Sequence, residues 1–288
     1  MKNKNLSVRI IAESAVMIAL ATILSLIKLI EMPYGGSVTL ASALPIGIIA
    51  YRHGMRPGLA SGIVFGVIQQ LLGLSNLSYF TTWQSILAVI LLDYLVAFAV
   101  IGFMGVFRDS RLLASLPIGK RQSAALSFGM LFVMILRYMC HTVSGATVWA
   151  GLSIPTSAAL FYSLGYNATY MIPEAVIAVS VAAWVGEAID FEHTVPKRMR
   201  VIADKKNRGP ILCEISMLSL LLTVIIDTIL VFPHLQDPES GEFTFSYLGN
   251  VNFAAFLAVS ICGLLISAAL IMAARFMMSA ENAELSKQ

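Results

Sequence analysis

The sequence predicts an all-α, polytopic membrane protein. Of its 288 residues, 58% are hydrophobic and 12% are charged, whereas a soluble domain carries roughly 25% charged residues. Several apolar runs reach the ~20 residues that an α-helix needs to cross the hydrocarbon core of a bilayer. Because lipid cannot satisfy an open strand edge, these runs are expected to be helices. The lipid bilayer is therefore the first expected partner.

The apolar runs define eight expected spans. They are residues 10–31, 38–51, 58–74, 83–106, 122–148, 158–186, 211–232 and 250–274. The second is short, as expected of a helix that is partly buried or re-entrant. The first is long enough to span, and no small-residue cleavage pattern follows it, so we expect no cleavable signal peptide.

The distribution of basic residues predicts the orientation of these spans. With a cytoplasmic N-terminus, 17 of the 19 Lys and Arg residues lie in inner segments, and the other two, Lys28 and Arg137, lie within spans. Basic residues favour the cytoplasmic side, and an even number of spans places both termini there. The outer loop 233–249 carries three acidic residues, Asp237, Glu239 and Glu242.

The chain is expected to divide at a basic, polar stretch. Residues 190–209 form a predicted cytoplasmic linker between a core module, 1–189, and an additional two-helix membrane segment, 210–288. No GxxxxGK[ST] phosphate loop occurs, so ATP-driven work would need another chain. The three cysteines lie in or beside apolar runs and are interpreted as packing residues: Cys140, Cys213 and Cys262. We expect no cofactor, no metal and no nucleic-acid partner.

Ionisable residues inside the spans are candidates for function. Each costs at least ~2.5–3.5 kcal/mol on insertion scales. They are Glu13, Lys28, Asp93, Arg137, His141, Glu174 and Asp227. A structural role is favoured for three of them: Glu13 and Lys28 lie near span ends, and Glu174 follows Pro173, where a broken helix frees backbone groups.

The fifth predicted span carries a stripe that indicates a ligand wall. Arg137, His141, Gly145 and Trp149 recur every four residues, which places them on one face of a helix. The alternative is a packing stripe whose polar members bond to neighbouring helices. Leu or Ala would pack there at lower cost, so the ligand wall is favoured.

The sixth and fourth predicted spans carry matching polar and aromatic residues. The sixth has Tyr162, Tyr166, Asn167 and Tyr170 at helical spacing, and the fourth has Asp93 and Tyr94, with Trp83 at its outer end. A tyrosine near the interface is common in membrane proteins, but a buried asparagine beside such a stripe is not. Aromatic walls with a carboxylate suit a flat, cationic ligand in an outward-facing pocket.

Small residues predict two close helix approaches. A ridge of glycines runs into the third span at Gly54, Gly58, Gly62 and Gly66, and internal packing is favoured there. Ala15 and Ala19 make a similar small face on the first span, which is a weak signal by itself because alanine is common in spans.

Several motifs resemble the thiamine-specific S components of energy-coupling-factor (ECF) transporters. The resemblance covers roughly residues 5–189. It rests on residues 33–40, 52–54, 73–79 and 92–98, on Arg137-Tyr138 with His141 and Trp149, and on Tyr162-Ser163-Leu164 with Asn167. It implies a six-helix fold with a cytoplasmic N-terminus and a thiamine pocket near the outer face. No counterpart is recognised for residues 190–288.

The resemblance also implies roles for the candidate residues. The family's acid and tyrosine on the fourth helix match Asp93 and Tyr94. The members of its fifth- and sixth-helix site match Arg137, His141, Gly145, Trp149, Tyr162 and Asn167. Its AxxxA docking face on the first helix matches Ala15 and Ala19, and implies a membrane-embedded coupling subunit and two ATPase subunits as partners.

This chain departs from some family members at the pocket. Some members carry an aromatic residue in the loop after the first helix, where this chain has Tyr34-Gly35-Gly36. The cover over the ligand is therefore expected to differ, and Trp83 is expected to compensate for that difference. Asp93 and Arg137 stand where some members have glutamate and lysine, which keeps the charge but changes the reach.

The expected function is high-affinity thiamine binding without catalysis. In this hypothesis Asp93 pairs with the cationic ligand, Trp149 and His141 stack on its rings, and its polar edges are satisfied by Arg137, Tyr162 and Asn167. One alternative is another cargo, such as hydroxymethylpyrimidine. A second is a self-sufficient proton-coupled carrier that uses Glu174 or Asp227. A membrane enzyme is the least favoured, because no paired acids or metal-ligand spacing occurs.

Overall fold

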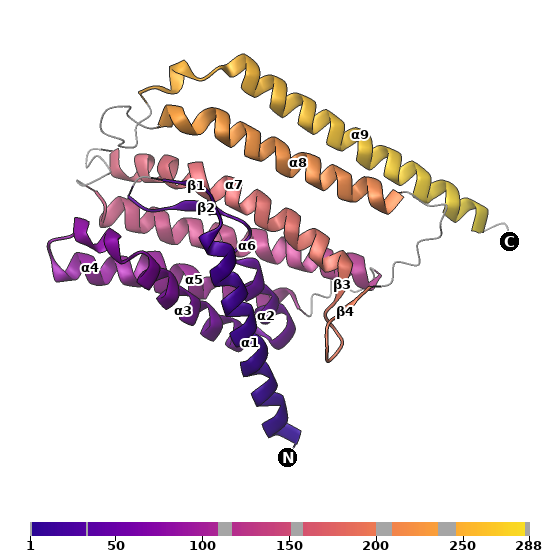
Figure 1. Ribbon diagram of the computed structural model, residues 1–288, viewed down its shortest axis with the longest axis horizontal. Coiled ribbons are helices and arrows are strands. Elements are labelled where there is room, and N and C mark those ends of the chain that lie inside the picture. The colour runs from indigo at the N-terminus through magenta and orange to yellow at the C-terminus, as the bar shows by residue number, and fades with distance from the viewer. Residues whose placement is uncertain are drawn as a thin grey trace. The chain divides into compact units, whose positions relative to one another are not determined.

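The computed structural model describes residues 2–32, 34–108, 117–150, 158–199, 209–235 and 246–285. The chain forms two compact units, Met1–Lys197 and Arg198–Gln288. Both are built mainly of helices, so the predicted all-α polytopic class is confirmed (Figure 1). The first unit contains α1 (Lys2–Leu26), β1 (Lys28–Glu31), β2 (Ser37–Thr39), α2 (Leu44–His53), α3 (Met55–Leu72), α4 (Trp83–Val89), α5 (Ala97–Ala99), α6 (Ile118–Thr147), α7 (Ala159–Ala188) and β3 (Ile189–Asp190).

The chain leaves the first helix earlier than predicted. α1 ends at Leu26, and residues 28–31 form β1, which pairs antiparallel with β2. The prediction of a helix through residue 31 is therefore wrong, because a short apolar run does not distinguish helix from strand. The turn between β1 and β2 uses Gly35 and Gly36, both with φ near +90°, a conformation that glycine adopts readily.

The predicted fourth span is continuous but changes its helical form. After α4, residues Ile90–Val96 are π-helical, α5 follows, and Val100–Phe107 are 3₁₀-helical. π-helical turns are rare and occur frequently at functional sites. The π-helical stretch includes Asp93 and Tyr94.

The glycine ridge of α3 packs within the first unit, as favoured from the sequence. A Cβ on Gly62 would lie 2.4 Å from the carbonyl oxygen of Phe98, and one on Gly66 would lie 2.7 Å from that of Tyr94. Such close backbone approach is what small residues permit between membrane helices. The ridge therefore brings α3 against the helix that carries Asp93.

The core of the first unit lies around α2. Residues 44–52 of α2 are all buried, and its 10 residues are half of what a span needs. The prediction of a short, buried second helix is confirmed, although α2 begins only at Leu44. Its neighbours in the core include the fully buried side chains of Phe65, Ile101, Met130 and Ile177.

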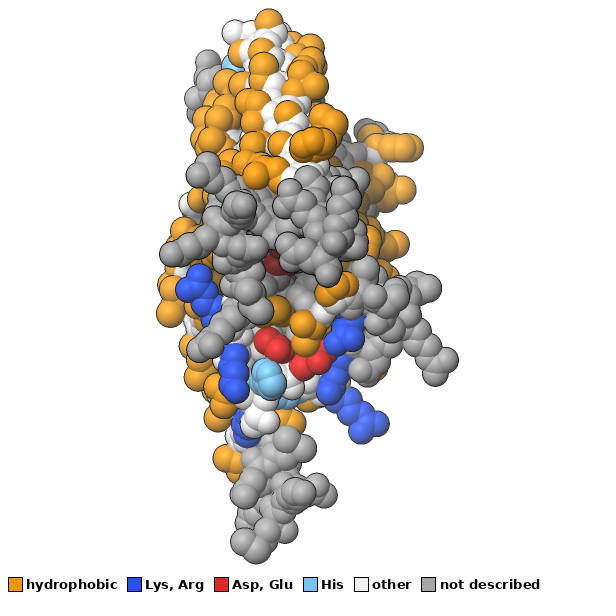
Figure 2. Space-filling view, turned by 90° about the vertical axis from the view of Figure 1, so that its right-hand side faces the viewer, with side chains coloured by type: hydrophobic (Ala, Val, Ile, Leu, Met, Phe, Trp, Pro, Cys, Tyr) orange, Lys and Arg blue, Asp and Glu red, His pale blue; other side chains and the backbone are white. Residues whose placement is uncertain are grey.

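Charged residues connect several elements at one end of the first unit. The carboxylate of Glu13 pairs with Arg52 and lies 2.9 Å from the Nε2 atom of His53, while Arg52 donates to the carbonyl oxygen of Phe191 at 2.9 Å. Figure 2 shows basic, acidic and histidine side chains gathered on the end that carries β3. Glu13 thus has the structural contacts expected of it. The rest of the predicted linker, residues 200–208, lies outside the described residues.

The second unit is a helical hairpin of α8 (Gly209–Val231) and α9 (Phe253–Leu285). The hydroxyls of Ser216 and Ser267 each donate to the other residue's carbonyl oxygen, at 3.0 and 3.2 Å. A Cβ on Gly263 would lie 1.9 Å from the hydroxyl of Thr223, so the two helices approach closely there. The predicted acidic loop residues Asp237, Glu239 and Glu242 lie outside the described residues.

Six helices within the described ranges are long and apolar enough to cross a membrane. They are Val8–Leu26, Trp83–Phe107, Ile118–Thr147, Ala159–Ala188, Leu218–Leu235 and Phe253–Ala274. Eight spans were predicted, and α2 and α3 are not among the six. α2 is too short, and α3 includes the polar residues Arg56, Gln69 and Gln70, which lower its hydropathy.

Candidate ligand-binding site

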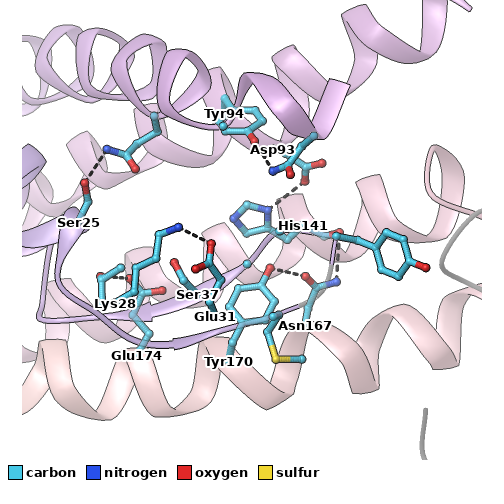
Figure 3. A pocket seen from close by; sticks show the side chains of 18 of the residues that line it. Ser25, Lys28, Glu31, Ser37, Asp93, Tyr94, His141, Asn167, Tyr170 and Glu174 are labelled. Carbon is cyan, nitrogen blue, oxygen red and sulfur yellow. Dashed lines mark hydrogen bonds and ion pairs between the residues drawn. The ribbon is translucent and has the colours of Figure 1, made fainter. Parts of the chain in front are cut away.

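A cavity of about 470 Å³ lies within the first unit, inside the ~300–1,000 Å³ range of small-molecule sites. Its lining comes from the end of α1, the β1–β2 hairpin, α3, the π-helical stretch, α6 and α7. Figure 3 shows side chains from these elements pointing into one space. Seven of the nine predicted ligand-binding residues line it: Asp93, Tyr94, Arg137, His141, Gly145, Trp149 and Asn167.

Asp93 is held by three donors, all from α6 and the residues that follow it. Its carboxylate lies 3.0 Å from the Nδ1 atom of His141 and accepts from the Ser144 hydroxyl at 2.6 Å and from the Trp149 indole N–H at 3.0 Å. His141 and Gly145 lie one turn apart on one face of α6, whereas Trp149 follows the end of that helix at Thr147, so the prediction that Trp149 continues the helical stripe is wrong. Trp149 still lines the cavity, and Figure 3 shows His141 opposite Asp93 of the π-helical stretch. The carboxylate is thereby fixed in position, and it can stabilise a cation without reorganising.

The two remaining predicted residues lie elsewhere. Trp83 is 69% exposed and does not line the cavity, so the expectation that it compensates for the altered loop lacks support in the structure. Tyr162 is half-buried and packs against a cluster that contains Phe80 and Trp149. It therefore lies behind the cavity wall rather than at its surface.

Further aromatic rings pack against Trp149 and Tyr34, which line the cavity. The Phe80 ring meets the Trp149 ring edge-on at 4.7 Å, and Tyr79 bridges toward Tyr34 of the hairpin, with ring centroids 5.2 Å apart. Tyr34 also lines the cavity. The quoted motifs contain Tyr34, Tyr79 and Trp149 but not Phe80, and the contacts among these rings depend on how two loops meet.

Asn167 and the tyrosines of α7 connect the hairpin to α6. The Asn167 amide donates to the Ser163 carbonyl oxygen at 2.9 Å and to that of His141 at 3.3 Å, and it accepts from the Tyr170 hydroxyl at 2.6 Å. Tyr166 donates to the carbonyl oxygen of Gly35 at 2.8 Å. The polar atoms of Asn167 are thus engaged by the protein, which fixes Tyr170 beside the cavity (Figure 3).

The β1–β2 hairpin covers one side of the cavity. A Cβ on Gly36 would lie 2.9 Å from the Tyr170 ring, and one on Gly35 would lie 2.8 Å from the Asn76 side chain. Lys28 and Glu31 of β1 also line the cavity and pair with each other. The apolar pattern predicts a helix at Lys28 and gives no signal for Glu31, because the pairing of β1 with β2 joins residues outside that pattern.

Glu174 is a lining residue for which sequence analysis favoured a structural role. It is 3% exposed, accepts from the Thr39 hydroxyl at 2.9 Å and lies 3.7 Å from an Arg137 nitrogen. The sequence did contain a signal for a lining role, because Glu174 is an acidic residue in the middle of an apolar span. Its partners were not predictable, because they lie in β2 and α6.

The predicted docking residues lie apart from this site. Ala15 and Ala19 are exposed on α1 and do not line the cavity. Among the described residues, no group of three or more His, Cys, Asp or Glu side chains could hold a metal ion.

A cavity of this kind inside a set of membrane helices is typical of membrane proteins that bind small molecules. Residues 11–189 match the family described as thiamine transporter protein (Thia_YuaJ). The chain belongs to this family, which consists of transport proteins and not enzymes. The family resemblance drawn from the sequence is therefore confirmed.

Individual relatives agree with this assignment. The chain is 36% identical over 172 residues to the thiamine transporter ThiT of Bacillus subtilis, covering 59% of this chain and 85% of that protein. It is 26% identical over 180 residues to ThiT of Lacticaseibacillus paracasei, covering 60% and 84%. A solved structure of ThiT from Listeria monocytogenes shares the fold, with a TM-score of 0.52, 23% identity, and coverage of 64% of this chain and 95% of that one.

Proposed function

We propose that this chain is the high-affinity thiamine-binding subunit of an ECF-type importer, and that thiamine binds in the cavity of the first unit. The observation that carries the proposal is the Asp93 carboxylate, fixed by His141, Ser144 and Trp149 beside an aromatic wall. Thiamine joins a flat aminopyrimidine to a cationic thiazolium ring. An oriented carboxylate and aromatic rings suit that chemistry.

The same proposal includes the partners and the orientation. Transport would require a membrane-embedded coupling subunit, docked at Ala15 and Ala19, and two ATPase subunits, because the chain has no phosphate loop of its own. No cofactor is required for binding. We propose that the protein resides in a bacterial cell membrane with a cytoplasmic N-terminus, as the basic residues predict.

Binding of thiamine to the purified chain tests this proposal directly. Isothermal titration calorimetry in detergent, without partner subunits or ATP, should show saturable binding of one thiamine per chain. Hydroxymethylpyrimidine, titrated in parallel, tests the alternative cargo. Tighter binding of the pyrimidine than of thiamine would reassign the cargo.

One observation favours a second candidate, a proton-coupled carrier that acts without partners. In the second unit, Ser260 donates to one oxygen of Asp227 at 2.7 Å, while the other oxygen is buried and has no hydrogen-bond partner among the described residues. An acid inside a membrane helix is a common proton-carrying group. Uptake driven by a proton gradient in vesicles that contain this chain as their sole protein would support this candidate.

A further inference from the structure

Arg137 and Glu174 form a buried pair of opposite charges in the cavity wall. They are 4% and 3% exposed, and an Arg137 nitrogen lies 3.7 Å from a Glu174 oxygen. Each charge would be costly alone in a membrane-embedded site, whereas together they compensate each other. The guanidinium lies over the Phe98 ring at 4.6 Å from its centroid, and the Thr39 hydroxyl donates to the carboxylate at 2.9 Å.

The hydrogen bonding of this pair is incomplete. The Nε atom of Arg137 is buried and has no hydrogen-bond partner among the described residues. The distance of 3.7 Å between the Arg137 nitrogen and the Glu174 oxygen is also longer than a hydrogen bond. The two groups therefore interact chiefly through their charges rather than through a tight bidentate contact.

The two charges of the pair cancel in the net charge of the cavity. Three carboxylates, of Glu31, Asp93 and Glu174, and two cations, of Lys28 and Arg137, line it, which gives a formal charge of −1 with His141 neutral. This charge matches a ligand that carries one positive charge. Without Glu174 the formal charge would be zero, and Arg137 would lack its buried counter-ion. Buried charges are poorly screened, so the mismatch would act on a cationic ligand elsewhere in the same cavity.

We infer that Glu174 is a specificity-determining residue, which neutralises Arg137 and so makes the cavity selective for a monocation. This inference rests on the proposed function. Glu174 lies beside the hairpin, and Asp93 lies on the other side of the cavity (Figure 3). Asp93 attracts the positive ring directly, and Glu174 prevents Arg137 from repelling it.

Two ligands of equal shape and different charge test this role. We would measure the affinities of thiamine and of a neutral isostere in which a thiophene replaces the thiazolium ring. Glu174→Gln keeps the shape and a hydrogen-bond acceptor for Thr39 but removes the charge. It should weaken thiamine binding about tenfold, or about 1.4 kcal/mol, and change binding of the isostere by less than about threefold. Glu174→Asp should retain most of the preference for thiamine. Glu192→Gln, at an exposed acid outside the cavity, is the matched control.

A double variant keeps the test decisive if Glu174→Gln is poorly folded. Arg137→Gln with Glu174→Gln returns the formal charge of the cavity to −1 and should restore the wild-type ratio of the two affinities, whatever contact is lost to both ligands. Equal losses for thiamine and the isostere in Glu174→Gln, or a ratio that stays low in the double variant, would overturn the inference. Absence of thiamine binding to the wild-type chain would instead overturn the proposed function.

Discussion

At the residue scale, the Asp93 carboxylate combines a negative charge with three bound donors. Asp93→Asn removes the charge and places an amide N–H against one of those donors. Removal of one partner from a buried, hydrogen-bonded charge pair costs ~2–5 kcal/mol, so we expect thiamine affinity to fall at least about tenfold. Calorimetry on the folded variant measures this, and an unchanged affinity would remove Asp93 from the binding site.

Trp149 offers a second test at the same scale. The protein has three tryptophans. Trp149 lines the cavity, whereas Trp83 and Trp184 are 69% and 50% exposed. Thiamine binding should therefore quench the fluorescence of Trp149, and Trp149→Phe should lose most of that change. Trp83→Phe and Trp184→Phe are the matched controls. If either of these abolished the quenching while Trp149→Phe did not, the ligand would lie elsewhere.

At the scale of elements, the β1–β2 hairpin depends on its glycines. Gly36 has φ of +91°, and a Cβ there would meet the Tyr170 ring at 2.9 Å. Gly54 has nearly the same φ, +92°, but a Cβ there meets nothing within 4 Å. Alanine at either position should lower thermal stability, at a cost of roughly 1–3 kcal/mol for a positive-φ backbone conformation that side chains rarely adopt. Only Gly36→Ala should also weaken thiamine binding, because it displaces Tyr170. Equal affinities in the two variants would contradict a closed hairpin over the ligand.

The exposed face of α1 belongs to the same scale. Ala19 precedes Ser25, the first lining residue, by about 9 Å of helix at ~1.5 Å per residue. Ala15→Trp together with Ala19→Trp should leave thiamine affinity nearly unchanged. Thiamine uptake by cells should collapse, because bulky side chains abolish close helix approach. Uptake that persists in this variant, and that a protonophore stops in ATP-replete vesicles, would favour the proton-coupled carrier and direct attention to Asp227.

At the scale of the whole molecule, the proposed binding cavity belongs entirely to one of the two units. All residues that line the cavity lie between Ser25 and Glu174, within the first unit. A chain that ends after Lys197 should therefore bind thiamine with the affinity of the full-length protein, as measured by calorimetry. Loss of binding in a truncated chain that remains monodisperse and helical would show that α8 and α9 support the site.

The sequence by itself determined the class of protein and one wall of its cavity. Composition and run length were sufficient for the membrane class, because lipid accepts long apolar helices and few charges. The face formed by Arg137, His141 and Gly145 followed from helical periodicity, which is a local property of the chain. Trp149 lines the same cavity from beyond the end of α6. Asp93 was selected as an ionisable residue inside a span, and Asn167 as an amide beside a tyrosine stripe. The structure places both at the same cavity.

Only the tertiary structure determined which residues lie opposite the α6 wall of the cavity. Thr39 and Glu174 are 135 residues apart in the chain, and their contact depends on the register of a strand against a helix. The exposure of Trp83 and the position of Tyr162 behind the wall depend on the rotation of their helices. The strand pairing of Lys28–Glu31 with Ser37–Thr39 depends on the turn between them, which the apolar pattern does not encode. Local periodicity defines the face of a helix, but the partner of that face is determined by long-range packing, which sums contacts over the whole unit.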